Sequence, residues 1–114
     1  MLGFLIDNML CLIDVFHYTV ILFRMFYFST GDSMAPHNGK AFSTKDRDND
    51  THKSKHCAAY YKGAWWHHGC HHVNINGLYV GNKVDDKGMR WSTFKGSQSM
   101  KTTSMMLRKT SNSN

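Results

Sequence analysis

The feature that most constrains this chain is an abrupt change of composition near Ser29. Residues 1–30 are crowded with Leu, Ile, Phe, Met and Tyr, whereas the remainder is polar, rich in turn-forming residues and poor in aliphatic ones. A chain of 114 residues forms one small domain at most, because so short a chain buries a modest fraction of its surface. We therefore divide it into an apolar segment, 1–30, a domain, 31–110, and a frayed tail, 111–114.

The apolar segment has three possible interpretations. It carries no Lys or Arg before its apolar part, and Asp7 and Asp14 interrupt it, which is atypical of a signal peptide. Asp14, His17 and Arg24 would each be costly at membrane depth. The segment is an atypical signal or anchor, an amphipathic structural helix, or an alternative start that replaces the true upstream sequence, and we favour the last. Membrane association is possible only through these residues.

Local signals beyond residue 30 are those of a loop-rich fold. Asn38-Gly39 and Asn76-Gly77 predict tight turns. We expect short β-rich pieces at 40–43, 78–80 and 104–108, and a mostly irregular stretch at 46–66 with one helical turn around 57–61. No amphipathic helix pattern follows residue 30.

The basic charge of the chain invites a nucleic-acid reading. The net charge is +6, and there is no glutamate. However, the Lys and Arg residues beyond residue 40 are scattered and mark no clear helical face. We interpret them as solvated surface and predict no nucleic-acid partner.

Three aspartates at every second position form the first candidate site. Asp46, Asp48 and Asp50 repel one another in a loop unless a cation lies between them, so the spacing favours a hard, oxygen-preferring metal such as calcium. The EF-hand pattern fails, because its sixth and twelfth positions, which should be Gly and Glu, are Thr51 and Cys57. A solvated acidic turn balanced by neighbouring lysines is the alternative.

The stretch "GAWWHHGCHHVN", residues 63–74, is the second candidate site, with four histidines and a cysteine close together. Adjacent side chains in a loop rarely converge on one ion, which argues against zinc. No Ser or Cys nucleophile is paired with a base in an interpretable motif, so we predict that the protein is not an enzyme.

A series of landmarks in one order carries a family resemblance. They are "NGKAFSTKD", the acidic triplet, two cysteines with twelve residues between them, "GAWW", "CH" followed by "NING" and a tyrosine, and "GMRWSTFKG". From Gly31 to Arg108 the chain resembles the C-terminal part of fibrinogen-like domains, the family of ficolins, tachylectins, angiopoietins, tenascins and fibrinogen chains. The resemblance implies an extracellular binding domain, secreted, that recognises acetylated sugars or protein partners.

The resemblance also implies a disulfide and a metal site. A Cys57–Cys70 disulfide would close a short loop and stabilise the fold by roughly 3 kcal/mol, with Trp65 and Trp66 packed around it. The implied cofactor is calcium, held by ligands that, placed on this sequence, are the carboxylates of Asp48 and Asp50 and the backbone carbonyls of His52 and Ser54.

The implied ligand pocket lies at the second cysteine of this pair. In the family the peptide bond before that cysteine, here Gly69-Cys70, is cis and turns a backbone N–H toward the ligand. His71 is similar to the family's pocket histidine, and Tyr61 to a tyrosine of the pocket wall, with Tyr60 beside it. Further aromatic residues usually come from the segments before "GMRW" and after "KG", but this chain has "VDDK" and "SQSM" there.

The sequence therefore predicts an α+β fold made mostly of loops: the calcium and ligand-pocket subdomain of a fibrinogen-like domain, truncated, with an unrelated apolar segment before it. In this interpretation the last strand, about 104–108, would be an unpaired edge. The predicted function is calcium-dependent, lectin-like binding of an acetylated sugar or a protein. Two alternatives remain: a non-functional or structural fragment, and a membrane-tethered binding fragment.

Overall fold

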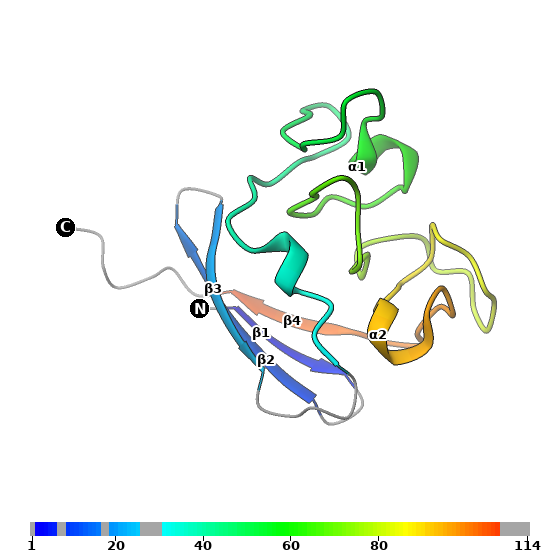
Figure 1. Cartoon of the computed structure of the whole chain (residues 1–114). Coiled ribbons are helices and arrows are strands. Elements are labelled where there is room, and N and C mark those ends of the chain that lie inside the picture. Colours follow the sequence, from blue (N-terminus) through cyan, green and yellow to red (C-terminus); the bar gives the residue numbers. More distant parts are fainter. Residues whose placement is uncertain (1, 7–8, 17–18, 26–30, 108–114) are drawn as a thin grey trace.

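The computed structural model describes residues 2–6, 9–16, 19–25 and 31–107. A four-stranded antiparallel sheet forms one layer, and a large assembly of loops lies to one side of it (Figure 1). The order of the strands across the sheet is β3-β2-β1-β4. Their bounds are Leu2–Ile6 for β1, Met9–Phe16 for β2, Thr19–Met25 for β3 and Ser104–Leu107 for β4.

The sheet joins the two ends of the described chain. Leu2 of β1 lies opposite Ile13 of β2 on one side and Leu107 of β4 on the other. The pairing of β2 with β3 is irregular between Asp14 and Val15. The prediction that the last strand would be an unpaired edge is therefore wrong, because β1 supplies the missing hydrogen-bonding partner.

The apolar segment folds into strands, so its interpretation as an amphipathic helix is also wrong. Short apolar runs fit a buried helix and a strand equally well, and the β-branched and aromatic residues within these runs favour the strand. Among the helices described, none has the length and the apolar character that a membrane crossing requires.

The loop assembly holds three short helical elements: a 3₁₀ helix η1 at Ala35–His37, α1 at Cys57–Tyr60 and α2 at Ser92–Lys95. The predicted helical turn around 57–61 is confirmed by α1, and the predicted strand at 104–108 by β4. The predicted turns are confirmed as well: Gly39 has φ +73°, and the N–H of Gly77 donates to the Asn74 carbonyl at 2.9 Å. The pieces expected at 40–43 and 78–80 are single bridges, not strands.

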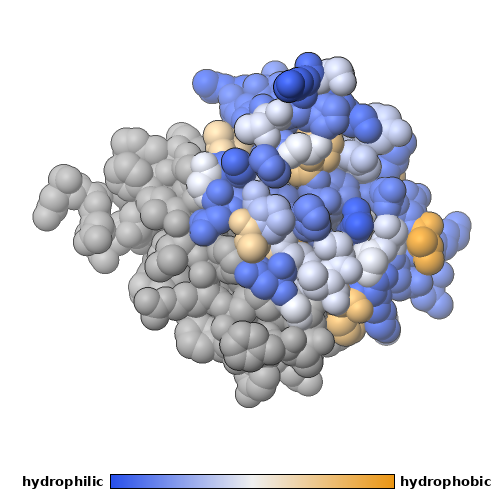
Figure 2. Space-filling view, viewed as in Figure 1, coloured by the Kyte–Doolittle hydropathy of each residue, from blue (hydrophilic) through white to orange (hydrophobic). Residues whose placement is uncertain are grey.

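The core of the loop assembly is small and contains an unusual share of polar side chains. Its buried apolar side chains are Met34, Cys57, Ala58, Trp65, Trp66, Val73, Ile75 and Trp91, and its buried polar ones are Ser33, His37, Ser43, His67, Asn74 and Ser99. The visible face of this part is mostly hydrophilic, with hydrophobic residues scattered singly (Figure 2). With so few aliphatic residues available, polar groups that bond to backbone supply much of what holds the loops in place.

Candidate functional site

A disulfide lies at the centre of the candidate site. Cys57, at the start of α1, is bonded to Cys70, and their Cα atoms are 5.2 Å apart. Trp65 and Trp66 lie within the loop that the bond closes, and both are buried. The structure thus confirms the Cys57–Cys70 pairing and the interpretation of the two tryptophans as core residues.

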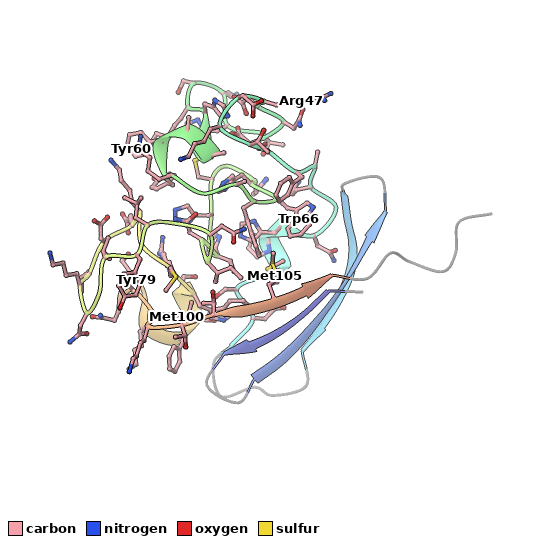
Figure 3. The ribbon with its side chains drawn as sticks, turned by 180° about the vertical axis from the view of Figure 1, so that it is seen from behind. Arg47, Tyr60, Trp66, Tyr79, Met100 and Met105 are labelled. Atoms are coloured by element: carbon pink, nitrogen blue, oxygen red, sulfur yellow. A yellow bond between two sulfur atoms is a disulfide. The ribbon has the colours of Figure 1, made fainter. Side chains whose placement is uncertain are left out.

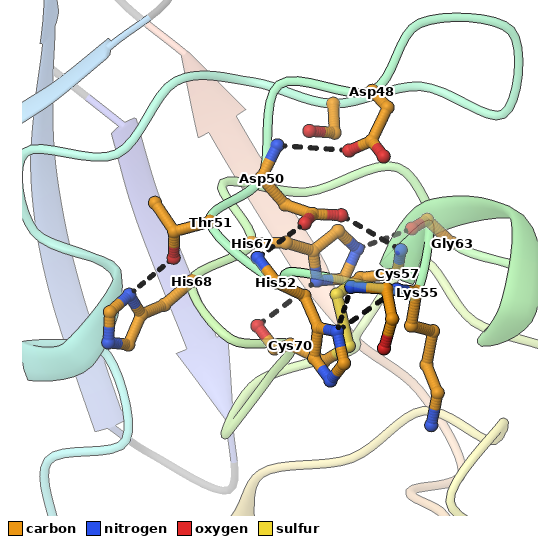
Figure 4. Close-up of a disulfide and its surroundings, with 12 residues drawn as sticks. Asp48, Asp50, Thr51, His52, Lys55, Cys57, Gly63, His67, His68 and Cys70 are labelled. Atoms are coloured by element: carbon orange, nitrogen blue, oxygen red, sulfur yellow. Dashed lines mark hydrogen bonds between the residues drawn. A yellow bond between two sulfur atoms is a disulfide. The ribbon is translucent and has the colours of Figure 1, made fainter.

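Asp50 ties the acidic loop to this disulfide (Figure 4). Its two carboxylate oxygens accept backbone N–H groups, one from His52 at 2.8 Å and one from Cys57 at 2.9 Å. Its own N–H donates to a carboxylate oxygen of Asp48 at 3.1 Å. A change in the position of the Asp48–Asp50 segment would therefore be transmitted directly to the half-cystine at residue 57.

The oxygen atoms expected to bind calcium are available in the described part of the chain. Asp48 is exposed. The carbonyl oxygens of His52 and Ser54 accept no hydrogen bond from any described residue. Each carboxylate oxygen of Asp50 accepts one N–H group and has a second lone pair left. Two carboxylates and two free carbonyls are the kind of donors that calcium takes, so these residues fit that ion.

Asp46, the first acid of the triplet, is bonded differently. It is exposed, and the hydroxyl of Thr44 donates to its carboxylate at 2.7 Å. This hydrogen bond, together with one to its own backbone, lowers the pKa of the Asp46 carboxyl below its usual value. Asp46 thus belongs to the turn at 44–47 and stands apart from the other two acids.

The rings of Tyr61 and His71 are in contact, and His71 directly follows Cys70 of the disulfide. Their ring centroids are 4.3 Å apart and the rings are nearly perpendicular. Both ring nitrogens of His71 are buried and have no hydrogen-bond partner within the part of the chain that the structure describes. Burial, and then the positive charge of Arg90, lower the pKa of His71 to about 3. At neutral pH this ring is therefore uncharged and has unused hydrogen-bonding capacity.

The expected cis bond at Gly69-Cys70 is wrong. No peptide bond among the described residues is cis, so this bond is trans. The trans form is strongly favoured wherever the next residue is not proline, and the N–H of His68 donates to the Cys70 carbonyl at 2.9 Å across the turn. The Cys70 N–H itself donates to no described acceptor, so its availability to a ligand does not depend on the cis form.

The four histidines of the second candidate site do not gather at one point, although the ring centroids of His67 and His71 lie 6.0 Å apart. The ring of His67 is buried and bonds to the Gly63 carbonyl at 2.8 Å, whereas His68 is exposed and bonds to the Thr51 hydroxyl at 2.9 Å. In the described ranges no group of three or more His, Cys, Asp or Glu side chains could hold an ion. The arrangement separates histidines that the sequence places side by side.

His37 is a structural residue that the sequence analysis missed. It is fully buried, its Nδ1 lies 2.7 Å from the Trp66 carbonyl, and its Nε2 lies 3.1 Å and 3.2 Å from the N–H groups of His72 and Val73. The neutral tautomer with the proton on Nδ1 satisfies all three partners. His37 is 29 residues from Trp66 in the sequence, so the spacing of nearby residues gives no sign of its buried structural role.

Two hollows lie away from this pair of rings. One, of about 280 Å³, is lined by residues between Asn82 and Thr102, and the other, of about 330 Å³, by Tyr79, Lys101 and their neighbours. Neither includes Tyr61, Gly69, Cys70 or His71. The structure therefore places Tyr61, Cys70 and His71 together at the disulfide, and none of the four predicted pocket residues in either hollow.

Comparison with known proteins identifies the fold. The family described as "Fibrinogen beta and gamma chains, C-terminal globular domain" matches residues 14–110. The chain belongs to this family. The match begins inside the segment that the sequence analysis set apart, and the division at residue 30 stays a prediction.

Individual relatives agree with this assignment. The chain is 43% identical over 83 residues to human "Fibrinogen C domain-containing protein 1", covering 70% of this chain and 18% of that protein. It is 47% identical over 68 residues to "Techylectin-5A" of Tachypleus tridentatus, covering 58% of this chain and 23% of that protein. The chain thus spans about a fifth of the length of the curated relatives it matches.

A solved structure shows the same arrangement in space. The fibrinogen-like globe domain of human ANGPTL2 superposes with a TM-score of 0.70 at 30% identity, covering 95% of this chain and 56% of that one. Fibrinogen C-terminal domains are generally non-catalytic binding modules, typically of extracellular proteins. Similarity to a protein named as a lectin suggests that this chain is such a binding module.

Proposed function

We propose that this chain is an extracellular, non-catalytic, lectin-like module that binds an acetylated sugar or a protein and depends on calcium. The observation that supports this most is the pairing of Tyr61 with a half-buried, neutral His71 whose ring nitrogens have no hydrogen-bond partner among the described residues. An unpaired buried polar atom is costly, and a ligand that hydrogen-bonds to it removes the cost. The Tyr61 ring, nearly perpendicular to the His71 ring, offers the apolar contact that an acetyl methyl group needs.

Calcium would act on this pocket through a short chain of bonds. Asp48, Asp50 and the carbonyls of His52 and Ser54 would hold the ion, which would neutralise the repulsion between the two carboxylates. Asp50 bonds to the N–H of Cys57, and Cys57 is linked to Cys70, which precedes His71. Ordering the acidic loop would thus fix one edge of the pocket.

Calcium titration tests the metal site. We expect calorimetry to show binding at or below millimolar concentration, with a rise in the melting temperature that grows with calcium concentration by mass action. Asp48→Asn should abolish both, whereas Asp86→Asn, which removes an exposed acid outside the loop, should change neither. Equal calcium response in the parent and in Asp48→Asn would exclude this site.

Sugar binding tests the pocket. We expect N-acetylglucosamine to bind and glucose not to bind, because only the former carries the acetyl group. His71→Ala should remove binding, and chelation of calcium should weaken it. Equal binding of the two sugars would count against an acetyl pocket at this position.

A further inference from the structure

The chain contains two Asn-Gly pairs, and the structure holds them differently. They are Asn38-Gly39 and Asn76-Gly77, and both asparagines are exposed. An asparagine before glycine is open to an intramolecular reaction in which the backbone nitrogen of the glycine attacks the side-chain carbonyl carbon. Glycine permits this attack because it has no Cβ to block the approach. Since both side chains reach solvent, a difference in reactivity between the two pairs has to come from the backbone.

The pair Asn76-Gly77 is held by hydrogen bonds and by packing. The N–H of Gly77 donates to the Asn74 carbonyl at 2.9 Å, and the side-chain amide of Asn76 donates to the Ala64 carbonyl at 3.1 Å. A Cβ on Gly77 would lie 2.5 Å and 2.6 Å from the carbonyl oxygens of residues 87–88, so backbone encloses this glycine. The attacking nitrogen and the amide are therefore both engaged, and the peptide plane between them has no room to turn.

The pair Asn38-Gly39 lacks these restraints. Among the described residues, neither the Asn38 side chain nor the Gly39 N–H has a hydrogen-bond partner, and a Cβ on Gly39 would meet nothing within 4 Å. The backbone angles, φ −63° and ψ 133° at Asn38 and φ +73° at Gly39, are those of a type II turn. The turn is closed by the Lys40 N–H, which donates to the His37 carbonyl at 3.2 Å. Its central peptide plane can therefore turn into open space.

We infer that Asn38 is a site of spontaneous deamidation and that the fold protects Asn76 in the same dipeptide. The Gly39 nitrogen, after losing its proton to hydroxide, forms a bond to the side-chain carbonyl carbon of Asn38, and the side-chain nitrogen leaves as ammonia. Water then opens the resulting cyclic imide. Opening at the side-chain carbonyl gives aspartate, and opening at the main-chain carbonyl gives isoaspartate, with no oxidation or reduction. This modification does not depend on the proposed function.

Deamidation at Asn38 changes the chain next to a buried structural residue. His37 directly precedes Asn38, and its ring bonds to the Trp66 carbonyl. Figure 3 shows Trp66 beside the 3₁₀ helix η1, which ends at His37. Both products add a negative charge, and isoaspartate also lengthens the main chain by a carbon atom within the turn that the His37 carbonyl closes. The modification thus acts on the backbone that positions the His37 ring.

Peptide mass spectrometry of the aged protein tests the inference. The purified chain is kept at slightly alkaline pH with its disulfide intact, and the two Asn-Gly peptides are followed by the mass difference between an amide and a carboxyl group. We expect Asn38 to convert at least about tenfold faster than Asn76, because hydrogen bonds that must break before the attack raise its barrier. Equal rates at the two asparagines, or a faster reaction at Asn76, would overturn the inference.

Unfolding separates protection by the fold from effects of the neighbouring sequence. In guanidinium chloride with the disulfide reduced, the two rates should converge, because nothing then holds Asn76-Gly77. A tenfold difference that persists in the denaturant would overturn the inference.

Matched variants assign the reaction to one residue. Asn38→Gln should remove most of the ammonia that the folded chain releases, because a glutamine side chain closes the corresponding ring less readily. Asn82→Gln changes an exposed asparagine that no glycine follows, and it should leave the release unchanged. Release from Asn38→Gln equal to that from the parent would place the reaction elsewhere and overturn the assignment.

Discussion

The imidazole of His37 bonds to backbone on both sides of Cys70: the Trp66 carbonyl before it, and the N–H groups of His72 and Val73 after it. The ring is fully buried. A hydrocarbon of similar size would remove these three hydrogen bonds. Each unpaired buried group costs roughly 1–3 kcal/mol.

We therefore expect His37→Phe to lower the free energy of unfolding by about 3 kcal/mol or more, measured by urea denaturation. His68→Ala, at an exposed ring with one hydrogen bond to Thr51, should cost less than about 1 kcal/mol. If the two variants prove equally stable, the buried hydrogen bonds of His37 are not what orders this loop.

At the scale of elements, the turn at Asn74–Gly77 links the core to the segment that carries Lys87. Asn74 donates its side-chain amide to the carbonyls of Tyr61 and Gly88, both at 3.2 Å. A Cβ on Gly77 would lie 2.5 Å from the Lys87 carbonyl and 2.6 Å from the Gly88 carbonyl. Since these are backbone atoms, they cannot rotate aside.

Gly77→Ala should accordingly cost about 2 kcal/mol of unfolding free energy, within the range of other overpacking substitutions. Gly69→Ala is the matched control, because an added Cβ there meets nothing within 4 Å and the backbone φ is ordinary. Thermal denaturation followed by circular dichroism compares the two. A Gly77→Ala protein that melts with the parent would show that the segment at 87–88 adjusts freely.

The secondary-structure elements also show which features the local sequence predicts and which it does not. Asn-Gly pairs predicted both turns because their chemistry is local, and a β-rich piece was also expected at 104–108, where β4 lies. The strands β1 to β3 were not predicted, because short apolar runs do not by themselves distinguish a strand from a buried helix. Their pairing is a property of the sheet, not of any one strand.

At the scale of the whole molecule, some contacts of the candidate site were predicted from the sequence and others were not. The resemblance supplied the disulfide, Tyr61 and His71, which the structure brings together. Neither composition nor motif indicated that the ammonium groups of Lys55 and Lys87 both lie over the Tyr60 ring, at 4.2 Å and 4.9 Å from its centroid. The two lysines are 32 residues apart, and neither belongs to a cluster of charges in the sequence. Convergence of this kind depends on how loops pack, and a single sequence carries no local trace of it.

Because neutral histidine rings are buried or half-buried in the fold, we expect the stability of the whole domain to depend on pH. Burial lowers the pKa of His37 to about 4 and that of His71 to about 3, and it also lowers the pKa of His67. The ordinary value is 6.5. As the pH falls below 6.5, the unfolded chain binds protons that the folded protein excludes, so the stability present above pH 6.5 is lost progressively toward pH 4.

His37 alone should account for roughly 3 kcal/mol of this loss between pH 6.5 and pH 4, at about 1.4 kcal/mol for each pH unit. Urea denaturation at several pH values between 7.5 and 4 measures the slope, and we expect the uptake of more than one proton on unfolding near pH 5. His71→Gln removes one titrating group and should make the slope shallower by up to one proton, while the loss due to His37 persists. A free energy of unfolding that stays level from pH 7 to pH 4.5 would mean that the buried rings are already charged in the folded protein, which the two N–H groups aimed at the Nε2 atom of His37 oppose.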